Sequence, residues 1–343
     1  MLGIRSAHRG GREVIEHWQI DVEDYVQDLS WSSDGQFVAI ITVEGEVWVC
    51  HHADQMAVFI GQHKGGGTSL SWRPGSTEFS TIGHDGMIRH WNASKCSLLM
   101  ELEAGSSWGT RVAWNSNGQR LASAAGKSLR LFTAEGKLDY ESSEHASTIA
   151  DIAWNPDGSE IAVAAYFGVT LHIPEKGVRR YEWKGSSLVL SWSPSKKFLV
   201  TGEQDSSVHV WYVKTGKDSR MTGFATKVLE LSWHRSGDYL ATGGSDSIIL
   251  WDCSGAGPEG REPRMLGAHP TRLTQLTFQS KGDDIASADA DGIVMLWTPL
   301  KSSEPYFFRG FDSMITRLAW SPDDQRLAVG ERDGKVTSIG FQA

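Results

Sequence analysis

Three residue types that together form hydrolase triads occur within about thirty positions of this sequence. His269, Ser287 and Asp291 lie in the segment GAHPTRLTQLTFQSKGDDIASADADGIVMLW, residues 267–297. A serine nucleophile, a histidine base and an aspartate that orients the histidine would together cleave an acyl bond. The alternative is that the three side chains hydrogen-bond to one another and hold a turn together. The choice depends on whether this segment is unique in the chain.

A second group with potential chemistry is Cys50, His51 and His52, with His63 not far along the chain. Thiolate and imidazole groups are ligands of zinc. However, neighbouring residues of a strand point to opposite faces of its sheet, which is unsuitable for a three-ligand site. The chain has three cysteines and no CxxC pair, so neither a zinc knuckle nor a disulfide framework is indicated. We therefore predict no metal, no cofactor and a reducing compartment, the cytoplasm.

Composition narrows the choice of partners. The chain has 343 residues, enough for one large domain or two ordinary ones, and a formal net charge of −9. Non-specific nucleic-acid binding relies on clustered Lys and Arg, so the acidic balance predicts no nucleic-acid partner. No run is apolar enough to span a membrane, and the start, MLGIRSAHRGGREV, lacks the apolar segment of a secretory signal. We expect no membrane partner and a flexible tail at residues 1–12.

A strand motif recurs along the whole chain, so the 267–297 segment is not unique. Each copy is a short alternating apolar strand that ends in an aromatic residue and precedes a tight polar turn, as in VQDLSW-SSDG and ITRLAW-SPDD. The closing aromatics are Trp31, Trp72, Trp114, Trp154, Trp192, Trp233, Phe278 and Trp320. Their spacing stays between 38 and 45 residues, which identifies an array of eight similar units.

Each unit continues with three more strands. The second is rich in small and β-branched residues, as in YLATGG (239–244), and the third often ends in tryptophan, as in IILW (248–251). The fourth is more variable, as in PYFFRG (305–310). Four short strands separated by turns, without helical periodicity, predict one antiparallel sheet per unit. One such sheet cannot cover its own faces, whereas a ring of them can, so the fold class is all-β.

These motifs resemble the WD-repeat β-propeller family. GxH-like, SPDG-like and (S/T)xDxxxxxW elements cover the chain from about residue 13, although only Trp251-Asp252 keeps the literal WD dipeptide. The resemblance implies a single propeller domain over residues 13–343. The unit count predicts about eight four-stranded antiparallel blades, with seven, the commoner number in the family, as the alternative. Because the chain stops after its last third strand, residues 13–21 (EVIEHWQID) are predicted to complete the last blade.

The repeat answers the question about the triad. Segment 267–297 is the seventh unit, and other units carry the same residue types at the matching places. Trp only donates, Asp only accepts, and Ser, Thr and His do both, so a relay satisfies every group. The family resemblance implies this tetrad, and we predict a structural role and no catalytic residue. The predicted tetrads comprise His63, Thr81, Asp85 and Trp91; Thr201, Asp205 and Trp211; Thr242, Asp246 and Trp251; and His269, Ser287, Asp291 and Trp297.

The resemblance also implies a role as a platform for a protein or peptide, because propellers of this family usually serve in this way. The top face of such a fold consists of the loops that enter the first strands and the turns between second and third strands. Aromatic and Arg residues at these loops are typical of interaction hot spots, although about half of the aromatics are expected to pack between blades. The predicted partner-binding residues are Tyr25, Lys64, Trp108, Tyr166, Phe167, Trp183, Phe224, Arg272, Phe311 and Arg332.

We therefore predict a non-enzymatic scaffold or adaptor, which acts alone or as a subunit of a larger complex. The alternative is a propeller enzyme, or a protein that binds a small ligand or cofactor in the central channel. Such a protein would need clustered Asp, Asn and Glu residues, and the sequence shows none. The sequence does not identify the partner.

Overall fold

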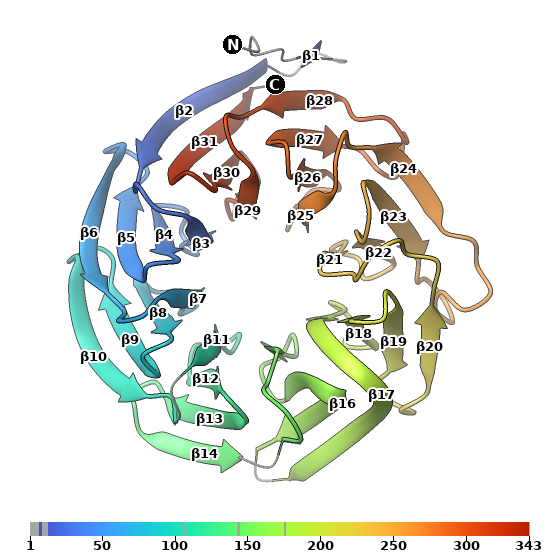
Figure 1. The fold of residues 1–343 in the computed structure, drawn as a ribbon, viewed down its shortest axis with the longest axis horizontal. Helices are drawn as coiled ribbons and strands as arrows, with labels where there is room; N and C mark the ends of the chain where they lie inside the picture. The colour runs from blue at the N-terminus through green and yellow to red at the C-terminus, as the bar shows by residue number, and fades with distance from the viewer. Residues whose placement is uncertain (1–6, 9–12, 106–107, 143–144, 175, 343) are drawn as a thin grey trace.

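A computed structural model describes residues 7–8, 13–105, 108–142, 145–174 and 176–342, and every regular element among them is a β-strand. The strands form a ring around a central axis, with each repeat running outward from that axis (Figure 1). Of the predicted tail, residues 1–12, only Ala7–His8 lies within the described residues, as the short strand β1.

The strands take four positions between the axis and the rim. The innermost strands are β3 (Val26–Trp31), β7 (Gly67–Trp72), β11 (Gly109–Trp114), β15 (Asp151–Trp154), the later part of β17 (Gly177–Trp192), β21 (Leu231–Trp233), β25 (Leu273–Phe278) and β29 (Ile315–Trp320). The second strands are β4 (Phe37–Thr42), β8 (Glu78–Gly83), β12 (Arg120–Ala125), the early part of β16 (Ile161–Ile173), β18 (Phe198–Glu203), β22 (Tyr239–Thr242), β26 (Ile285–Asp289) and β30 (Arg326–Glu331).

The third and outermost strands complete each repeat. The third strands are β5 (Glu46–His51), β9 (Met87–Asn92), β13 (Ser128–Thr133), the later part of β16, β19 (Val208–Tyr212), β23 (Ser247–Asp252), β27 (Ile293–Trp297) and β31 (Lys335–Gln342). The outermost strands are β6 (Met56–Gln62), β10 (Ser97–Glu103), β14 (Leu138–Ser142), the early part of β17, β20 (Asp218–Met221), β24 (Arg264–Ala268), β28 (Phe307–Gly310) and β2 (Glu13–Asp21).

Hydrogen bonding connects these strands into seven sheets. Five sheets have four strands, and β1 adds a fifth strand to the sheet β25–β28. The six-stranded sheet β15–β20 holds two repeats, because β17 pairs first with β16 and then, from Ser187 onward, with β18. The predicted all-β propeller of four-stranded antiparallel sheets is confirmed, with eight repeats carried in seven sheets. We call each repeat a blade and number them from blade 1 (β3–β6) to blade 8 (β29–β31 and β2).

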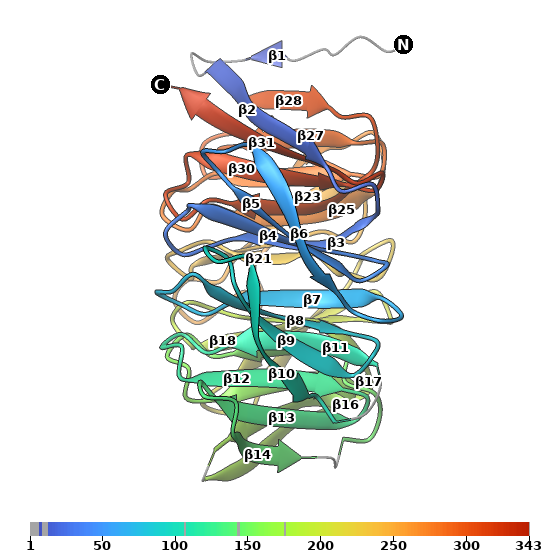
Figure 2. The ribbon, with the colours of Figure 1, turned by 90° about the vertical axis from the view of Figure 1, so that its left-hand side faces the viewer.

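The N-terminal strand lies at the outer edge of blade 8. β2 pairs with β31 from Glu13 opposite Gln342 to Asp21 opposite Lys335, and Figure 2 shows the two strands crossing the side of the ring together. Trp18 of β2 is 3% exposed and packs in one apolar cluster with Trp31 of blade 1. The N-terminal strand therefore completes the last blade and packs against the first.

In five of the eight blades, the recurring aromatic of the innermost strand donates a hydrogen bond to a backbone carbonyl of the preceding blade. The indole Nε1 of Trp72 donates to the carbonyl oxygen of Ser30 at 3.0 Å, and that of Trp154 donates to the carbonyl oxygen of Ala113 at 3.0 Å. Trp31, Trp192 and Trp320 make the same kind of bond. A tryptophan fits this place because its ring fills the space between two sheets while its single donor finds a partner.

Candidate functional site

The four predicted tetrad residues of blade 2 form a complete hydrogen-bonded relay. Trp91 Nε1 donates to Thr81 Oγ1 at 2.8 Å, and the two ring nitrogens of His63 lie 2.8 Å from Thr81 Oγ1 and 3.0 Å from Asp85 Oδ1. Burial would raise the pKa of Asp85, but hydrogen bonds from His63 and Arg89 hold it well below its usual range. The relay joins two strands, an entry loop and a turn.

Blade 7 brings together Trp297, Ser287 and His269, but the acid of its relay is Asp289. Trp297 Nε1 donates to Ser287 Oγ at 2.8 Å, and His269 lies 2.7 Å from Ser287 Oγ and 3.1 Å from Asp289 Oδ2. The predicted residue, Asp291, is exposed in the turn, so this assignment was wrong. Asp289 is the last residue of the buried strand β26, two residues before Asp291. Its other carboxylate oxygen accepts the backbone N–H groups of Asp291 and Ile293.

Blade 2 uses the farther aspartate because it has no side chain at the nearer place. Gly83 follows Thr81 by two residues, as Asp289 follows Ser287. A Cβ atom at Gly83 would lie 2.6 Å from the Cβ of His63, so that place is closed to any larger residue. The acceptor must then come from the turn, from Asp85.

In blades 5 and 6 only the Trp–Thr part of the relay forms. Trp211 Nε1 donates to Thr201 Oγ1 at 3.2 Å, and Trp251 Nε1 donates to Thr242 Oγ1 at 3.1 Å. The predicted acids are both exposed and lie outside the relay. Asp205 accepts from Ser207 and pairs with Arg220, and Asp246 accepts from Ser245 and Ser247. Neither entry loop places a histidine against the threonine, so these carboxylates have no imidazole to orient.

The tetrads do not have the geometry of a hydrolytic site. Ser287 is fully buried, with Trp297 and His269 on its hydroxyl. A nucleophile needs open approach for a substrate and donors for the oxyanion. Ser287 instead accepts one hydrogen bond and shares another within a closed set of buried groups, which is the arrangement of a structural relay.

Cys50, His51 and His52 do not converge on a common point. Burial raises the pKa of Cys50 to about 12, which disfavours the thiolate that a metal requires. His51 pairs with Asp54 at 3.1 Å, and His52 accepts a hydrogen bond from Trp18 at 3.2 Å. Within the part of the chain that the structure describes, no group of three or more His, Cys, Asp or Glu side chains is placed to hold a metal ion.

The entry loops and the turns between second and third strands hydrogen-bond to one another around one end of the ring, the top face. Trp108 N donates to the His84 carbonyl at 3.1 Å, and Gly126 N donates to the Trp108 carbonyl at 3.3 Å.

The ten predicted partner-binding residues belong to these loops or to the strand ends beside them, but they differ in exposure. Lys64, Trp108, Tyr166, Phe167, Arg272 and Arg332 are exposed, and Tyr25, Trp183 and Phe311 are partly buried. Phe224 is 9% exposed and packs in the core with Trp251.

The assignment of Phe224 to the partner surface was therefore wrong. Its ring lies 6.3 Å from that of Trp251, at the side where blades 2 and 7 have a tetrad histidine. Blade 6 fills this place with an apolar ring instead of an imidazole.

A ring of equivalent side chains lines the central channel, three residues before each closing aromatic. These are Asp28, Ser69, Arg111, Asp151, Val189, Glu230, Gln275 and Arg317, and all of them line one cavity of about 570 Å³ together with Tyr25 and Arg272. Several of the charges pair between neighbouring blades, with Arg111 Nε 2.9 Å from Asp151 and Arg317 Nε 3.3 Å from Asp28. The same two aspartates also accept backbone N–H groups of the next innermost strands. The ring therefore joins neighbouring blades close to the axis.

Tyr166, Phe167 and Trp183 share a pocket of about 760 Å³ in blade 4. Tyr166 and Phe167 are 45% and 51% exposed, and their rings lie 4.2 Å apart. They lie where the chain passes from the early to the later part of β16, and Phe167 and the following Gly168 have φ values of 72° and 99°. This part of the chain uses Gly168, which adopts a positive φ without steric cost. It also places a bulky aromatic in the left-handed region that such residues rarely adopt.

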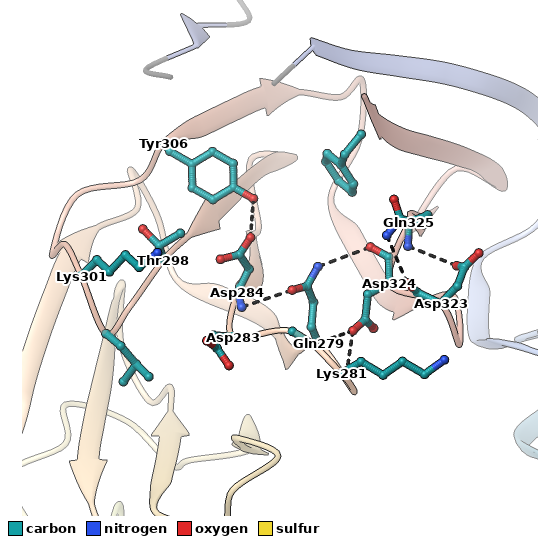
Figure 3. A pocket seen from close by; sticks show the side chains of 13 residues that line it. Gln279, Lys281, Asp283, Asp284, Thr298, Lys301, Tyr306, Asp323, Asp324 and Gln325 are labelled. Carbon is teal, nitrogen blue, oxygen red and sulfur yellow. Dashed lines mark hydrogen bonds between the residues drawn. The ribbon is translucent and has the colours of Figure 1, made fainter. Parts of the chain in front are cut away.

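A third hollow, of about 670 Å³, lies on the opposite face between blades 7 and 8 (Figure 3). Its acidic side chains are engaged in holding turns together. The Asp324 carboxylate accepts the backbone N–H groups of Lys281 at 2.7 Å and Gly282 at 2.8 Å, and Tyr306 donates to Asp284 at 3.0 Å. This hollow is therefore part of the contact between two blades, and we assign it no ligand.

Sequence reasoning missed three buried acids at the same place in their blades, Asp289, Glu203 and Glu331. Each is the last residue of a second strand, and this shared position is the signal that could have found them. Glu203 accepts a hydrogen bond from Ser187 at 2.8 Å, and burial raises the pKa of its carboxyl.

Glu331 should make stability depend on pH in the neutral range. Burial raises its pKa from 4.5 to about 7, so the folded state binds a proton that the unfolded state releases near pH 4.5. The stabilisation is fully present below about pH 4.5 and is lost as the pH rises through 7. We expect Glu331→Gln, which keeps a neutral side chain, to be more stable than the wild type at pH 8 by on the order of 2 kcal/mol. Urea unfolding at pH 5 and pH 8 tests this, and an equal pH dependence of both proteins would contradict it.

Within the described residues, no helix is long and apolar enough to cross a membrane.

Comparison with known proteins places these features in a family. Residues 29–117 match the model of the anaphase-promoting complex subunit 4 WD40 domain. Residues 179–212, 218–252, 260–298 and 303–337 match the model described as WD domain, G-beta repeat. The matched segments together cover more than half of the chain.

Among curated proteins, the chain is similar to THO complex subunit 3 of Arabidopsis thaliana, at 25% identity over 54% of this chain and 61% of that protein. It is 24% identical to the serine-threonine kinase receptor-associated protein of Dictyostelium discoideum, over 79% of this chain and 94% of that protein. It is 21% identical to the B-type cell cycle switch protein ccs52A of Medicago truncatula, over 68% of this chain and 51% of that protein. The chain thus spans less than two thirds of the first and the third of these relatives. Among solved structures, the computationally designed Ika8 protein superposes with a TM-score of 0.80 at 20% identity, over 95% of this chain and 99% of that one.

Proposed function

Since this chain belongs to the WD-repeat β-propeller family, we propose that it is a non-enzymatic scaffold that binds a protein or peptide partner on its top face. The observation that carries the proposal is the exposure of large apolar and cationic side chains on that face. Trp108 is 64% exposed, more than any other aromatic ring among the exposed large hydrophobic residues of the described chain. Its ring packs against His84, whose Nδ1 lies 2.9 Å from the carbonyl oxygen of Gly65, next to Lys64. An exposed tryptophan on a loop-rich face is typical of a protein-binding hot spot.

The arrangement of the polar groups favours binding over catalysis. The Ser–His–Asp set is closed and buried, and four of the five ring charges in the channel, those of Asp28, Arg111, Asp151 and Arg317, pair between blades. The fifth, Glu230, accepts the backbone N–H of Leu229. One of the relatives is by name a subunit of a complex, which supports membership of a larger assembly for this chain too. We infer that the partner is not a nucleic acid, because the net charge is −9. Residence in the cytoplasm stays a prediction from the sequence.

The proposal predicts that Lys64→Ala/Trp108→Ala loses its partner and keeps its fold. Both side chains are exposed, so the melting temperature should stay within about 1 °C of the wild type. Removal of a hot-spot aromatic costs about 2 kcal/mol of binding energy or more, equivalent to roughly 30-fold in affinity. Affinity capture from native lysate, read by mass spectrometry and followed by titration of the captured protein, measures the effect. Phe311, which is half-buried beneath Arg309, is not a suitable target because its loss would also disturb packing.

The matched control is Leu98→Ala/Leu99→Ala on the outermost strand of blade 2, where both side chains are exposed at 44% and 43%. It removes apolar surface from the rim, so it should capture the same partners as the wild type. Loss of the partner in this control but not in Lys64→Ala/Trp108→Ala would contradict a top-face site. If the wild type captures no protein, the scaffold proposal fails and a small ligand in the channel becomes the next candidate.

A further inference from the structure

Blade 4 lacks the hydrogen-bonded relay that blade 2 completes. The innermost and second strands pair in the same register in both blades, with Trp72 opposite Phe79 and Trp154 opposite Ile161. Counting from these pairs, Val163 takes the place of Thr81. His172 takes the place of Trp91, because it pairs with Val178 near the start of the outermost strand as Trp91 pairs with Leu98. The hydroxyl that would accept from an indole is therefore missing, and an imidazole replaces a larger ring.

The smaller ring leaves space. His172 lines the pocket of about 760 Å³ in blade 4, which we call the blade-4 pocket and define by His145, Tyr166, Phe167, His172, Arg180 and Trp183. In blade 2 the Trp91 indole packs among apolar side chains of blades 1 and 2. A pocket of this size is in the range of sites that bury most of a small ligand or a large side chain.

A buried donor in this pocket has no partner. His172 is 2% exposed, and its Nδ1 lies 2.9 Å from the hydroxyl of Tyr140. Burial, with His145 and Arg180 nearby, lowers the pKa of His172 to about 4, so the ring is neutral at pH 7. When the Tyr140 hydroxyl donates to Nδ1, the proton of the ring sits on Nε2, and Nε2 has no hydrogen-bond partner among the described residues. A buried unpaired N–H favours a ligand that brings an acceptor.

The lining is more basic than the protein as a whole. Arg180 and Lys184 carry two positive charges, opposed by the single carboxylate of Glu182, in a chain whose net charge is −9. The exposed rings of Tyr166 and Phe167 form an apolar part of the same lining. The combination of an apolar surface, an orphan donor and exposed cations is complementary to an apolar group flanked by carboxylates.

We propose that the blade-4 pocket binds an acidic peptide segment, which inserts one large apolar side chain and pairs its carboxylates with Arg180 and Lys184. This inference rests on the proposed function, because it assigns the partner class and one position on the top face where a peptide partner would dock. Among the described residues, the indole Nε1 of Trp183 has no hydrogen-bond partner, and like Nε2 of His172 it is a buried atom, so the inserted side chain reaches either donor only when its ring shifts.

The test rebuilds the missing relay. Val163→Thr/His172→Trp restores in blade 4 the residue types that blade 2 has at the same places, and the larger ring fills the pocket. The probe is a fluorescein-labelled peptide with one phenylalanine between aspartates, and fluorescence anisotropy at 0.15 M salt measures its binding. We expect saturable binding to the wild type and binding at least about 10-fold weaker to the rebuilt protein. A melting temperature no lower than that of the wild type shows that the rebuilt blade folds.

A second pair of variants tests the charges without altering the core. Arg180→Glu/Lys184→Glu should weaken the probe by roughly 10-fold. The control Lys95→Glu/Lys301→Glu makes the same change of net charge at exposed positions on the opposite face, and it should bind within about 2-fold of the wild type. A peptide with glycine in place of the phenylalanine should lose most of its affinity for the wild type.

Four results would overturn the proposal: no saturable binding to the wild type, equal binding to the rebuilt protein, equal weakening by the control charge pair, or equal affinity of the glycine peptide. These outcomes are separate from failure of the proposed function. If a protein partner is captured equally by the wild type and the rebuilt protein but is lost with Lys64→Ala/Trp108→Ala, the platform stands and only the blade-4 assignment fails.

Discussion

Removing residues 1–22 is expected to lower the free energy of unfolding by about 5 kcal/mol or more, and to leave a chain that aggregates on heating. The segment contains β2, a strand of nine residues of which eight pair with β31. Its loss would uncover a row of backbone donors and acceptors and remove Trp18 and Val22, which are 3% and 1% exposed. Thermal and urea unfolding of the truncated and full-length chains measure the effect.

Point variants in β2 test the contribution of its buried side chains separately from the loss of the whole strand. Trp18→Ala removes a buried ring that also donates to His52, so it should cost about 3–5 kcal/mol. Gln19→Ala, the next residue along the same strand and exposed, should cost under about 1 kcal/mol. A truncated chain that unfolds at the temperature of the full-length protein would show that β2 contributes nothing to closing the ring.

The sequence predicts this architecture well because the signal repeats eight times. The closing aromatic recurs wherever an innermost strand meets the preceding blade, and the same packing requirement selects it each time. The assignment of residues 13–21 to the outer edge of the last blade followed from counting strands. The continuous strand β17 could not be predicted in this way, because residues 184–187 (KGSS), between the fourth strand of blade 4 and the first of blade 5, have the composition of a turn but are part of one strand in the structure.

The acids of the relays are less predictable because two positions in each turn can supply one. In blade 2 a glycine closes the nearer position, and the acid comes from Asp85. In blade 7 both positions hold aspartate, and burial selects Asp289 over Asp291. Which aspartate accepts from the histidine depends on how closely the entry loop that carries this histidine approaches the turn. The spacing of residues within one repeat does not reveal that distance.

Exposure of loop aromatics is equally a matter of three-dimensional context. Phe224 and Trp108 both follow a fourth strand, yet one is 9% and the other 64% exposed. Phe224 fills a place in its blade that a histidine fills elsewhere, whereas the His84 ring beside Trp108 leaves that indole on the surface. A sequence pattern identifies the loop but not which of its residues turns inward.

Asp289→Ala is expected to destabilise the protein by about 3–5 kcal/mol, whereas Asp291→Ala should stay within about 0.5 kcal/mol of the wild type. Asp289 is fully buried and accepts from His269, Asp291 N and Ile293 N. Its removal leaves a buried imidazole nitrogen and two backbone donors without acceptors, and each unpaired buried group costs about 1–3 kcal/mol. Asp291 is exposed and takes part in the turn through its backbone.

Each variant removes one aspartate carboxylate, and the two positions are two residues apart at the same turn, so each variant serves as the control of the other. Urea unfolding at pH 7 gives the difference in free energy, and Ser287→Ala, which removes the hydroxyl shared by Trp297 and His269, should fall close to Asp289→Ala. The double variant Ser287→Ala/Asp289→Ala should cost less than the sum of the two single changes, because both act through His269. Additive effects, or a larger loss for Asp291→Ala than for Asp289→Ala, would mean that the relay of blade 7 does not act as one hydrogen-bonded unit.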